Sequence, residues 1–134
     1  MHLETLDINI LAVVVAAIAQ FVLGWVWYSP GVFGKQWATA QGGKEPPPPS
    51  PKLALFLIGA LIAAGVIATV YGWAGGDGLL DGLVVGVVLS LFLLIFHTLE
   101  GLVMGGRSMS YVLIQDGYTL VGYALMGTII GVLN

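Results

Sequence analysis

Four long apolar segments dominate the pattern of hydrophobic and polar positions along the chain. They run over about residues 8–28, 51–73, 79–104 and 109–133. A helix rises 1.5 Å per residue, so roughly 20 apolar residues are enough to cross the hydrocarbon core of a bilayer. The pattern therefore predicts an all-α protein, an integral membrane four-helix transmembrane bundle, formed by a single domain over residues 1–134.

The breaks between these segments carry turn signals. Ser29-Pro30 ends the first segment, because a residue that precedes proline disfavours the helical region. Pairs of glycines end the second and third segments, at positions 75–76 and 105–106. The first of these glycine turns is very short, so the second and third segments are predicted to be antiparallel neighbours.

A short helix is predicted in the connection that follows the first segment. Its apolar residues are Val32, Phe33 and Trp37, and Lys35 and Gln36 lie between them. Such a mixture is typical of a helix that lies in the membrane interface. The proline run that follows, within residues 46–51, predicts an extended spacer, with a docking strand for a partner as the alternative.

Aromatic side chains mark the predicted ends of the spans. Tryptophan and tyrosine are enriched where a membrane meets water, because one end of each ring system is apolar and the other is polar. The residues predicted to act as interfacial anchors are Trp25, Trp27, Tyr28, Trp37, Tyr71 and Trp73.

The composition agrees with a bilayer environment and excludes several functional classes. Of the 134 residues, 58% are hydrophobic and 8% are charged, with a mean hydropathy of +0.99, whereas soluble domains average about 25% charged residues. The net charge of −3 without a basic patch argues against nucleic acid as a partner. There is no cysteine, and the two histidines and dispersed acids form no metal-ligand spacing. No nucleophile–base arrangement or phosphate loop is recognisable. We therefore expect no enzyme activity, catalytic residue, cofactor or metal.

The distribution of charge predicts an orientation. All four basic residues lie in or beside the loops that follow the first and third segments: Lys35, Lys44, Lys52 and Arg107. The acids near the opposite ends are Glu4, Asp7, Asp77 and Asp81. Because short cytoplasmic loops are enriched in lysine and arginine, both termini are predicted to lie outside the cytoplasm, in a multi-pass protein of the cell inner (plasma) membrane. The N-terminus lacks the basic region and cleavage site of a signal peptide, so the first segment is expected to stay in the mature protein.

Small residues recur at a spacing of four on the predicted spans. The spacings are Gly82/Gly86, Gly101/Gly105, Gly127/Gly131 and Ala60/Ala64/Ala68. Such ridges allow helix backbones to approach closely in lipid. More small faces are present than a four-helix bundle needs, and this favours association with other chains.

Several polar residues fall inside the third and fourth segments. Counting outward from Gly106, His97 and Asp116 lie at almost the same depth, near the middle of the bilayer, and Glu100 lies one turn from His97 on the same helix face. A carboxylate at a helix centre costs about 2.5–3.5 kcal/mol on insertion scales, so these groups should face each other or a wet cavity. The candidate polar membrane site comprises His97, Glu100, Asp116, Arg107, Gln115 and Tyr118.

Two interpretations of this site remain open. In the functional one, His97, Glu100 and Asp116 handle a proton or cation, with Arg107 at the cytoplasmic mouth. In the structural one, His97 and Asp116 form a buried pair that fixes the register of the two segments, and Glu100 reaches Arg107 or water. Gln115 is expected to form an interhelical hydrogen bond. The Tyr118 hydroxyl needs a partner, for which Glu100, His97 or a helix carbonyl is available.

Two stretches together resemble a known family. The first is Leu23–Pro30 with Phe33-Gly34-Lys35 and Trp37, and the second includes Glu100-Gly101, Arg107-Ser108 and Gly117-Tyr118. They are similar to the bacterial family called domain of unknown function 1761, whose members are small membrane proteins of four predicted spans. The resemblance implies a fold and no activity. Members of that family tend to carry asparagine at the position of Asp116, so the resemblance does not imply an ionisable group there.

These observations lead to two hypotheses about function. The first is a non-enzymatic integral membrane protein that acts through helix–helix association, as a homo-oligomer or as a small accessory subunit of a larger membrane complex. Its partners would be the lipid bilayer and other membrane helices. The alternative is a small dimeric proton-coupled transporter or channel that uses Glu100, His97 and Asp116.

Overall fold

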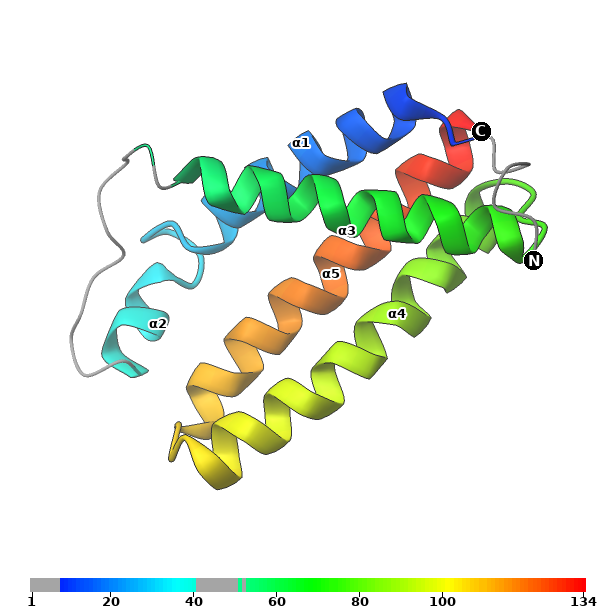
Figure 1. Cartoon of the computed structure of the whole chain (residues 1–134). Coiled ribbons are helices and arrows are strands. Elements are labelled where there is room, and N and C mark those ends of the chain that lie inside the picture. The colour runs from blue at the N-terminus through cyan, green and yellow to red at the C-terminus, as the bar shows by residue number, and fades with distance from the viewer. Residues whose placement is uncertain (1–7, 41–50, 52) are drawn as a thin grey trace.

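The fold is an all-α arrangement of four long helices and a short one, seen in a computed structural model that describes residues 8–40, 51 and 53–134 (Figure 1). The elements are α1 (Ile10–Trp27), α2 (Gly34–Ala40), α3 (Leu53–Trp73), α4 (Leu79–Leu99), the π-helix η2 (Glu100–Met104) and α5 (Met109–Leu133). By length and composition, α1, α3, α4 with η2, and α5 are each able to cross a membrane. The predicted four-span helical fold is confirmed. Most of the proline run, together with Lys44, Lys52, Glu4 and Asp7, lies outside the described residues.

The beginning of α1 and the end of α5 are joined directly. The Asn9 side chain accepts a hydrogen bond of 3.1 Å from the Ala12 amide and so caps α1. The same side chain donates to the Leu133 carbonyl at 2.8 Å. The first and last spans of the chain, α1 and α5, are therefore antiparallel neighbours, and this hydrogen bond joins the start of one to the end of the other.

The α3–α4 connection is a tight glycine turn. Gly75 and Gly78 have φ values of +70° and +91°, which favour glycine because it has no Cβ. The Tyr71 hydroxyl accepts a hydrogen bond of 2.9 Å from the Gly78 amide, and the Asp81 carboxylate accepts one of 2.9 Å from the Asp77 amide. The turn therefore closes over Tyr71, which is only 5% exposed.

Glycines also bring α4 and α5 into backbone contact. A Cβ on Gly82 would overlap the Gly127 carbonyl oxygen, and one on Gly86 would overlap the Tyr123 carbonyl oxygen. Gly131 packs in the same way against the carbonyl of Gly78. We call this contact the glycine seam. Two of the small-residue spacings noticed in the sequence, Gly82/Gly86 and Gly127/Gly131, thus face each other.

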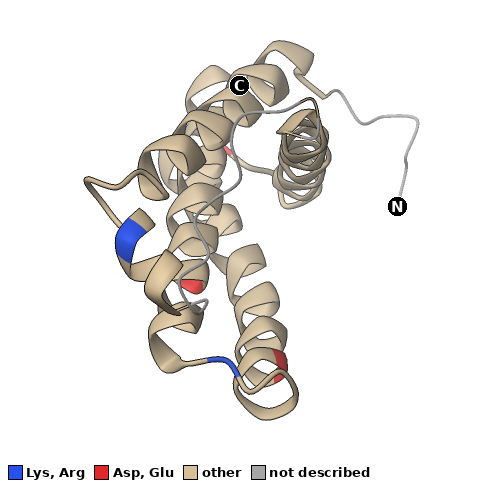
Figure 2. Cartoon of the chain, turned by 90° about the vertical axis from the view of Figure 1, so that its left-hand side faces the viewer, with Lys and Arg blue, Asp and Glu red and all other residues tan. Residues whose placement is uncertain are grey.

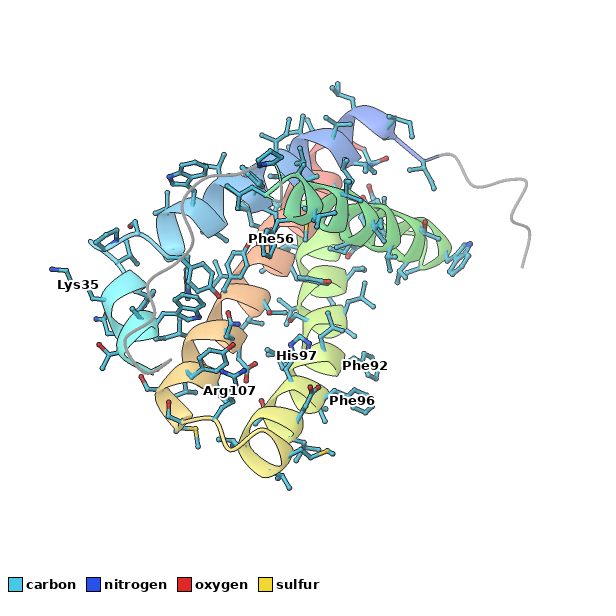
Figure 3. All side chains as sticks on the ribbon, turned by 60° about the vertical axis from the view of Figure 1, so that its left-hand side comes forward. Lys35, Phe56, Phe92, Phe96, His97 and Arg107 are labelled. Atoms are coloured by element: carbon cyan, nitrogen blue, oxygen red, sulfur yellow. The ribbon has the colours of Figure 1, made fainter. Side chains whose placement is uncertain are left out.

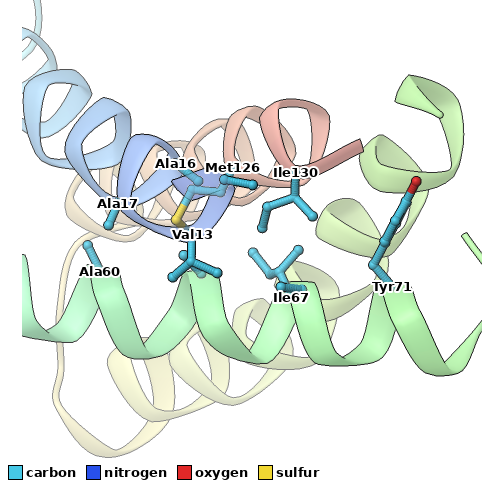
Figure 4. Close-up of a cluster of buried hydrophobic side chains, with 11 residues drawn as sticks. Val13, Ala16, Ala17, Ala60, Ile67, Tyr71, Met126 and Ile130 are labelled. Atoms are coloured by element: carbon cyan, nitrogen blue, oxygen red, sulfur yellow. The ribbon is translucent and has the colours of Figure 1, made fainter. Parts of the chain in front are cut away.

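A second packing centre joins α1, α3 and α5 (Figure 4). Small residues of α1 and α3 bring these two helices together, and larger side chains fill the space beside them. The cluster contains Ala12, Val13, Ala16 and Ala17 of α1, Ala60, Ala64, Ile67, Ala68 and Tyr71 of α3, and Met126 and Ile130 of α5. Because α5 belongs to both packing centres, it is the helix that holds the other spans together.

The helices do not form a parallel bundle. Figure 1 shows α4 and α5 side by side along their length, while α3 crosses them obliquely near the ends of the chain. The half of the α4–α5 hairpin that approaches its turn therefore projects beyond α3. That half carries the polar residues of the predicted site.

The described basic residues lie toward one end of the bundle. Lys35 of α2 and Arg107 of the α4–α5 turn lie toward this end (Figure 2), and Asp77 of the α3–α4 turn and Asp81 of the first turn of α4 lie at the other. The orientation of these ends relative to the cytoplasm stays a prediction.

The glycine seam can be tested by adding one methyl group. Gly82→Ala should lower the free energy of unfolding by about 1–3 kcal/mol, because the new Cβ meets the α5 backbone, which cannot give way cheaply. Gly65→Ala on α3 is the matched control: no atom lies within 4 Å of its Cβ position, and alanine has the higher helix propensity. Unfolding in mixed detergent micelles, followed by circular dichroism, measures both. Equal stability of the two variants would contradict the seam.

Candidate functional site

The most enclosed acid in the spans, Asp116 of α5, is hydrogen-bonded to α4 through a threonine. The Thr98 hydroxyl donates to Asp116 Oδ2 at 2.5 Å. The other oxygen, Oδ1, is buried without a hydrogen-bond partner among the described residues. Asp116 is thus an interhelical acceptor with one oxygen left unsatisfied.

This arrangement corrects the predicted His97–Asp116 pair. His97 is exposed and forms no ion pair or hydrogen bond within the described part of the chain, and Thr98 takes its place. Counting residues outward from the turn gives the depth of a side chain in the membrane. It does not give the direction in which that side chain projects from the helix axis. Neighbouring residues of a helix project about 100° apart, so the step from position 97 to 98 decides which side chain faces α5.

Glu100 lies on the side of α4 that no other described element covers. It begins η2, where the Gly105 amide bonds to the Glu100 carbonyl at 2.7 Å, an i to i+5 bond. Its carboxylate makes no ion pair with Arg107, whose guanidinium carbon sits 4.7 Å from the centre of the Tyr111 ring instead. The interpretation in which Glu100 reaches Arg107 is therefore wrong. The alternative, in which Glu100 reaches water, stays a prediction.

The surroundings of Glu100 are apolar and exposed. Phe92 and Phe96 project side by side from α4 (Figure 3), and Phe96 is 72% exposed. We call this surface the α4 outer face, and it consists of Phe92, Phe96, Leu99, Glu100 and Val103. A shallow groove of about 640 Å³ lies on it, lined by Phe96, Leu99, Glu100, Val103, Met104 and Gly105.

A second group of polar contacts fastens the end of α1 to the first half of α5. Trp27 Nε1 donates to the Ile114 carbonyl at 3.1 Å. The Tyr28 hydroxyl donates to Gln115 Oε1, and Gln115 Nε2 donates to the Tyr111 hydroxyl at 3.2 Å. Gln115 therefore has a partner for both ends of its amide, as an interhelical role requires.

Stacked aromatic rings complete this α1–α2–α5 junction. Tyr28 lies edge-on to Trp37 of α2 and to Tyr118 of α5, with ring centroids 5.5 and 5.4 Å apart, and Trp27 packs on Phe33 at 4.7 Å. The Tyr118 hydroxyl donates to the Gln20 carbonyl at 3.1 Å, so a helix carbonyl is its partner. Burial raises the pKa of Tyr28, which follows the last residue of α1, above its ordinary value. The phenol therefore stays a hydrogen-bond donor.

Two glycines allow the junction to close. A Cβ on Gly34 would collide with the backbone of Tyr28 and Ser29, and one on Gly117 would lie 3.0 Å from the Trp27 ring. One packed unit is thus formed by two stretches of the sequence, Trp27–Pro30 and Phe33–Lys35. That unit folds α2 back onto α5.

The six predicted interfacial anchors fall into two groups. Trp25 and Trp73 are 58% and 47% exposed, which suits contact with headgroups. The other four are engaged inside the protein, namely Trp27, Tyr28, Trp37 and Tyr71. Among residues that the sequence analysis did not single out, Thr98 matters most. Its position could have been found by continuing the spacing of four residues from Gly82, Gly86 and Ser90, which are buried, through Leu94 to Thr98.

Comparison with known proteins identifies a family and no relative of established activity. The model of the family described as "Protein of unknown function (DUF1761)" matches residues 11–131. Neither the curated proteins nor the solved structures gave a match to the chain. Within the residues that the structure describes, no group of three or more His, Cys, Asp or Glu side chains is placed to hold a metal.

The Thr98–Asp116 contact predicts an ordered set of stabilities. Thr98→Val should lower the free energy of unfolding by about 1–2 kcal/mol, because it leaves a second Asp116 oxygen unsatisfied between the helices. Thr98→Ser keeps the hydroxyl and should restore most of the loss. His97→Ala, one residue away and exposed, should change the value by less than about 0.5 kcal/mol. The same micelle titration measures all three variants, and a larger cost for His97→Ala than for Thr98→Val would overturn this assignment.

Proposed function

We propose that this chain, which belongs to the DUF1761 family of proteins of unknown function, acts through association between membrane helices rather than as an enzyme. The proposed form is a homo-oligomer, and two copies are the simplest case. The same proposal places the protein in the cell inner membrane, with the end that carries Lys35 and Arg107 in the cytoplasm. The positive-inside rule supports this orientation.

One observation carries the proposal: a carboxylate lies on the uncovered side of a spanning helix. Glu100 is exposed on the α4 outer face, within the span Leu79–Met104, and has no ion-pair partner in the described residues. Ionisable groups within spans almost always face a bundle interior, a wet cavity or a charged partner. In a single chain the α4 outer face meets lipid, where an ionisable side chain is costly. An assembly that covers this face removes that cost.

The chemistry of the α4 outer face favours a second copy of the same chain as the partner. His97 lies at the edge of this face, about 100° around the helix from Phe96, and one turn from Glu100, separated from it by about 4.5 Å along the helix axis. In a two-fold dimer each helix presents the same residues at the same depth. Glu100 of one copy then lies within one turn of His97 of the other, and both copies gain the same contact. The projecting rings of Phe92 and Phe96 supply apolar surface around it.

A cysteine-scanning experiment tests this arrangement, and the chain suits it because it contains no cysteine. Phe96→Cys lies on the α4 outer face and should form a disulfide-linked dimer when the protein is oxidised in liposomes. Ile62→Cys, on the exposed side of α3, is the control and should remain monomeric. Gel electrophoresis without reductant separates the two outcomes. Cross-linking of Ile62→Cys alone would place the interface elsewhere.

The charged pair can be tested in the same system. Glu100→Gln should weaken self-association about tenfold, since interhelical hydrogen bonds in model peptides are worth about 1–2 kcal/mol. Asp81→Asn removes an equal charge from the exposed turn at the other end and should leave association unchanged. Energy transfer between labelled copies, measured over a dilution series of lipid, gives the dissociation constants. A chain that stays monomeric in lipid and is recovered with another protein would instead be the accessory subunit.

A second candidate function is a small dimeric proton-coupled transporter or channel that uses Glu100, His97 and Asp116. The observation that favours it is Asp116 Oδ1, which is buried and has no hydrogen-bond partner among the described residues. Acids within spans often mark proton or ion pathways.

Proton flux into liposomes under an imposed pH gradient distinguishes the two functions. On the association proposal, the wild type should carry no more flux than empty liposomes. The transporter requires wild-type flux that Asp116→Asn, Glu100→Gln or His97→Ala abolishes while the dimer stays intact.

A further inference from the structure

A shallow, open cleft lies between α2 and the first turn of α5, away from the α4 outer face. It has a volume of about 320 Å³ and is lined by Lys35, Gln36, Thr39, Ala40, Ser108 and Ser110. Five of these six residues carry a polar side chain and none is acidic. The two sides of the cleft come from segments that are about 70 residues apart in the sequence.

The groups around the cleft are available as hydrogen-bond donors. Lys35 is exposed and forms no ion pair among the residues described. Its side chain extends outward from α2 (Figure 3), on a four-carbon stem that is free to turn over the cleft that it lines. The Ser108 hydroxyl oxygen accepts from the Tyr111 amide at 3.2 Å, which leaves its proton free to be donated. An ammonium that can turn toward several hydroxyl donors suits an anion.

The cleft is a built feature, because α2 is held in place. Trp37 of α2 packs edge-on against Tyr28, and Phe33, just before α2, packs on Trp27. Gly34 is buried against the backbone of Tyr28 and Ser29. The two sides of the cleft are therefore fixed relative to each other before any ligand arrives.

We propose that this cleft binds a phosphate group, as carried by the headgroup of an anionic phospholipid or by free phosphate. Phosphate oxygens accept hydrogen bonds from ammonium and hydroxyl groups, and these bonds are strengthened by charge. The cleft lies beside the end of α1, at the end of the bundle that carries both described basic residues. A headgroup would reach this level from the surrounding leaflet. The inference does not depend on dimerisation.

Native mass spectrometry of the full chain tests the inference by counting bound ligands. The probes are phosphatidylglycerol, phosphatidylcholine at equal concentration, and inorganic phosphate. Saturable binding of one anionic ligand per chain is expected, and Lys35→Gln should weaken it at least about fivefold. Ser110→Asp places a carboxylate at the cleft and should weaken binding as much, while circular dichroism confirms that the fold persists.

Arg107→Gln is the matched control, since Arg107 is a cation at the same end of the bundle that does not line the cleft. It should bind as the wild type does. Preference for phosphatidylglycerol over phosphate identifies a lipid site, and the reverse preference identifies a site for the free anion. Equal losses in Lys35→Gln and Arg107→Gln would show general attraction to surface charge and overturn the proposal. Absence of saturable binding, or equal binding of phosphatidylcholine, would overturn it as well.

Discussion

The backbone contact between α4 and α5 is the constraint on which the rest of the structure depends. Lipid tails are as apolar as leucine, so spanning helices gain little from burying apolar side chains against one another and depend on close packing instead. Glycines at Gly82, Gly86 and Gly127 remove the side chains that would keep the two backbones apart. These glycines fix the distance between the two backbones near the start of α4 and the end of α5. The two helices then stay together as far as their turn, and Thr98 is brought to Asp116. The polar contact is then a consequence of the packing and adds register to it.

The helix α5 meets each neighbour through a different kind of chemistry. It meets α4 through glycine backbone, α1 and α3 through an apolar cluster around Met126 and Ile130, and the α1–α2 corner through tryptophan and tyrosine donors. The hydrogen bonds from Trp27 and Tyr28 explain how α5 can be so polar and still be stable as a membrane helix. Its mean hydropathy is the lowest of the four spans, 1.3, because it supplies hydrogen-bonding groups to its neighbours. One side of α4 is left uncovered by this internal packing.

Much of the fold follows from sequence alone, and the limits of that reasoning have a physical cause. Span length and turn residues predict four membrane helices and the short helix after the first, since both depend on local chain properties. The rotation of a helix about its axis depends on the neighbouring helix against which it packs. For this reason the predicted pairing of His97 with Asp116 was wrong, and the row of buried small residues that leads to Thr98 was not noticed. Trp27 makes a hydrogen bond to α5 that was not predicted, for the same reason. Its position at the end of a span indicates an anchor, and only the path of α2 brings α5 within reach of its indole. The oblique course of α3 left no recognised trace in the sequence.

Unequal spans that cross obliquely have a consequence for the membrane itself. The 18 residues of α1 span about 27 Å and the 25 residues of α5 about 38 Å, so both fit one hydrocarbon core only if they tilt by different amounts. Tilt is the cheapest response of a long helix to a thinner bilayer. The α4–α5 hairpin moves as one body because its backbones touch, whereas α3 joins it through a glycine turn. A change in bilayer thickness should thus act on the angle between α3 and the hairpin.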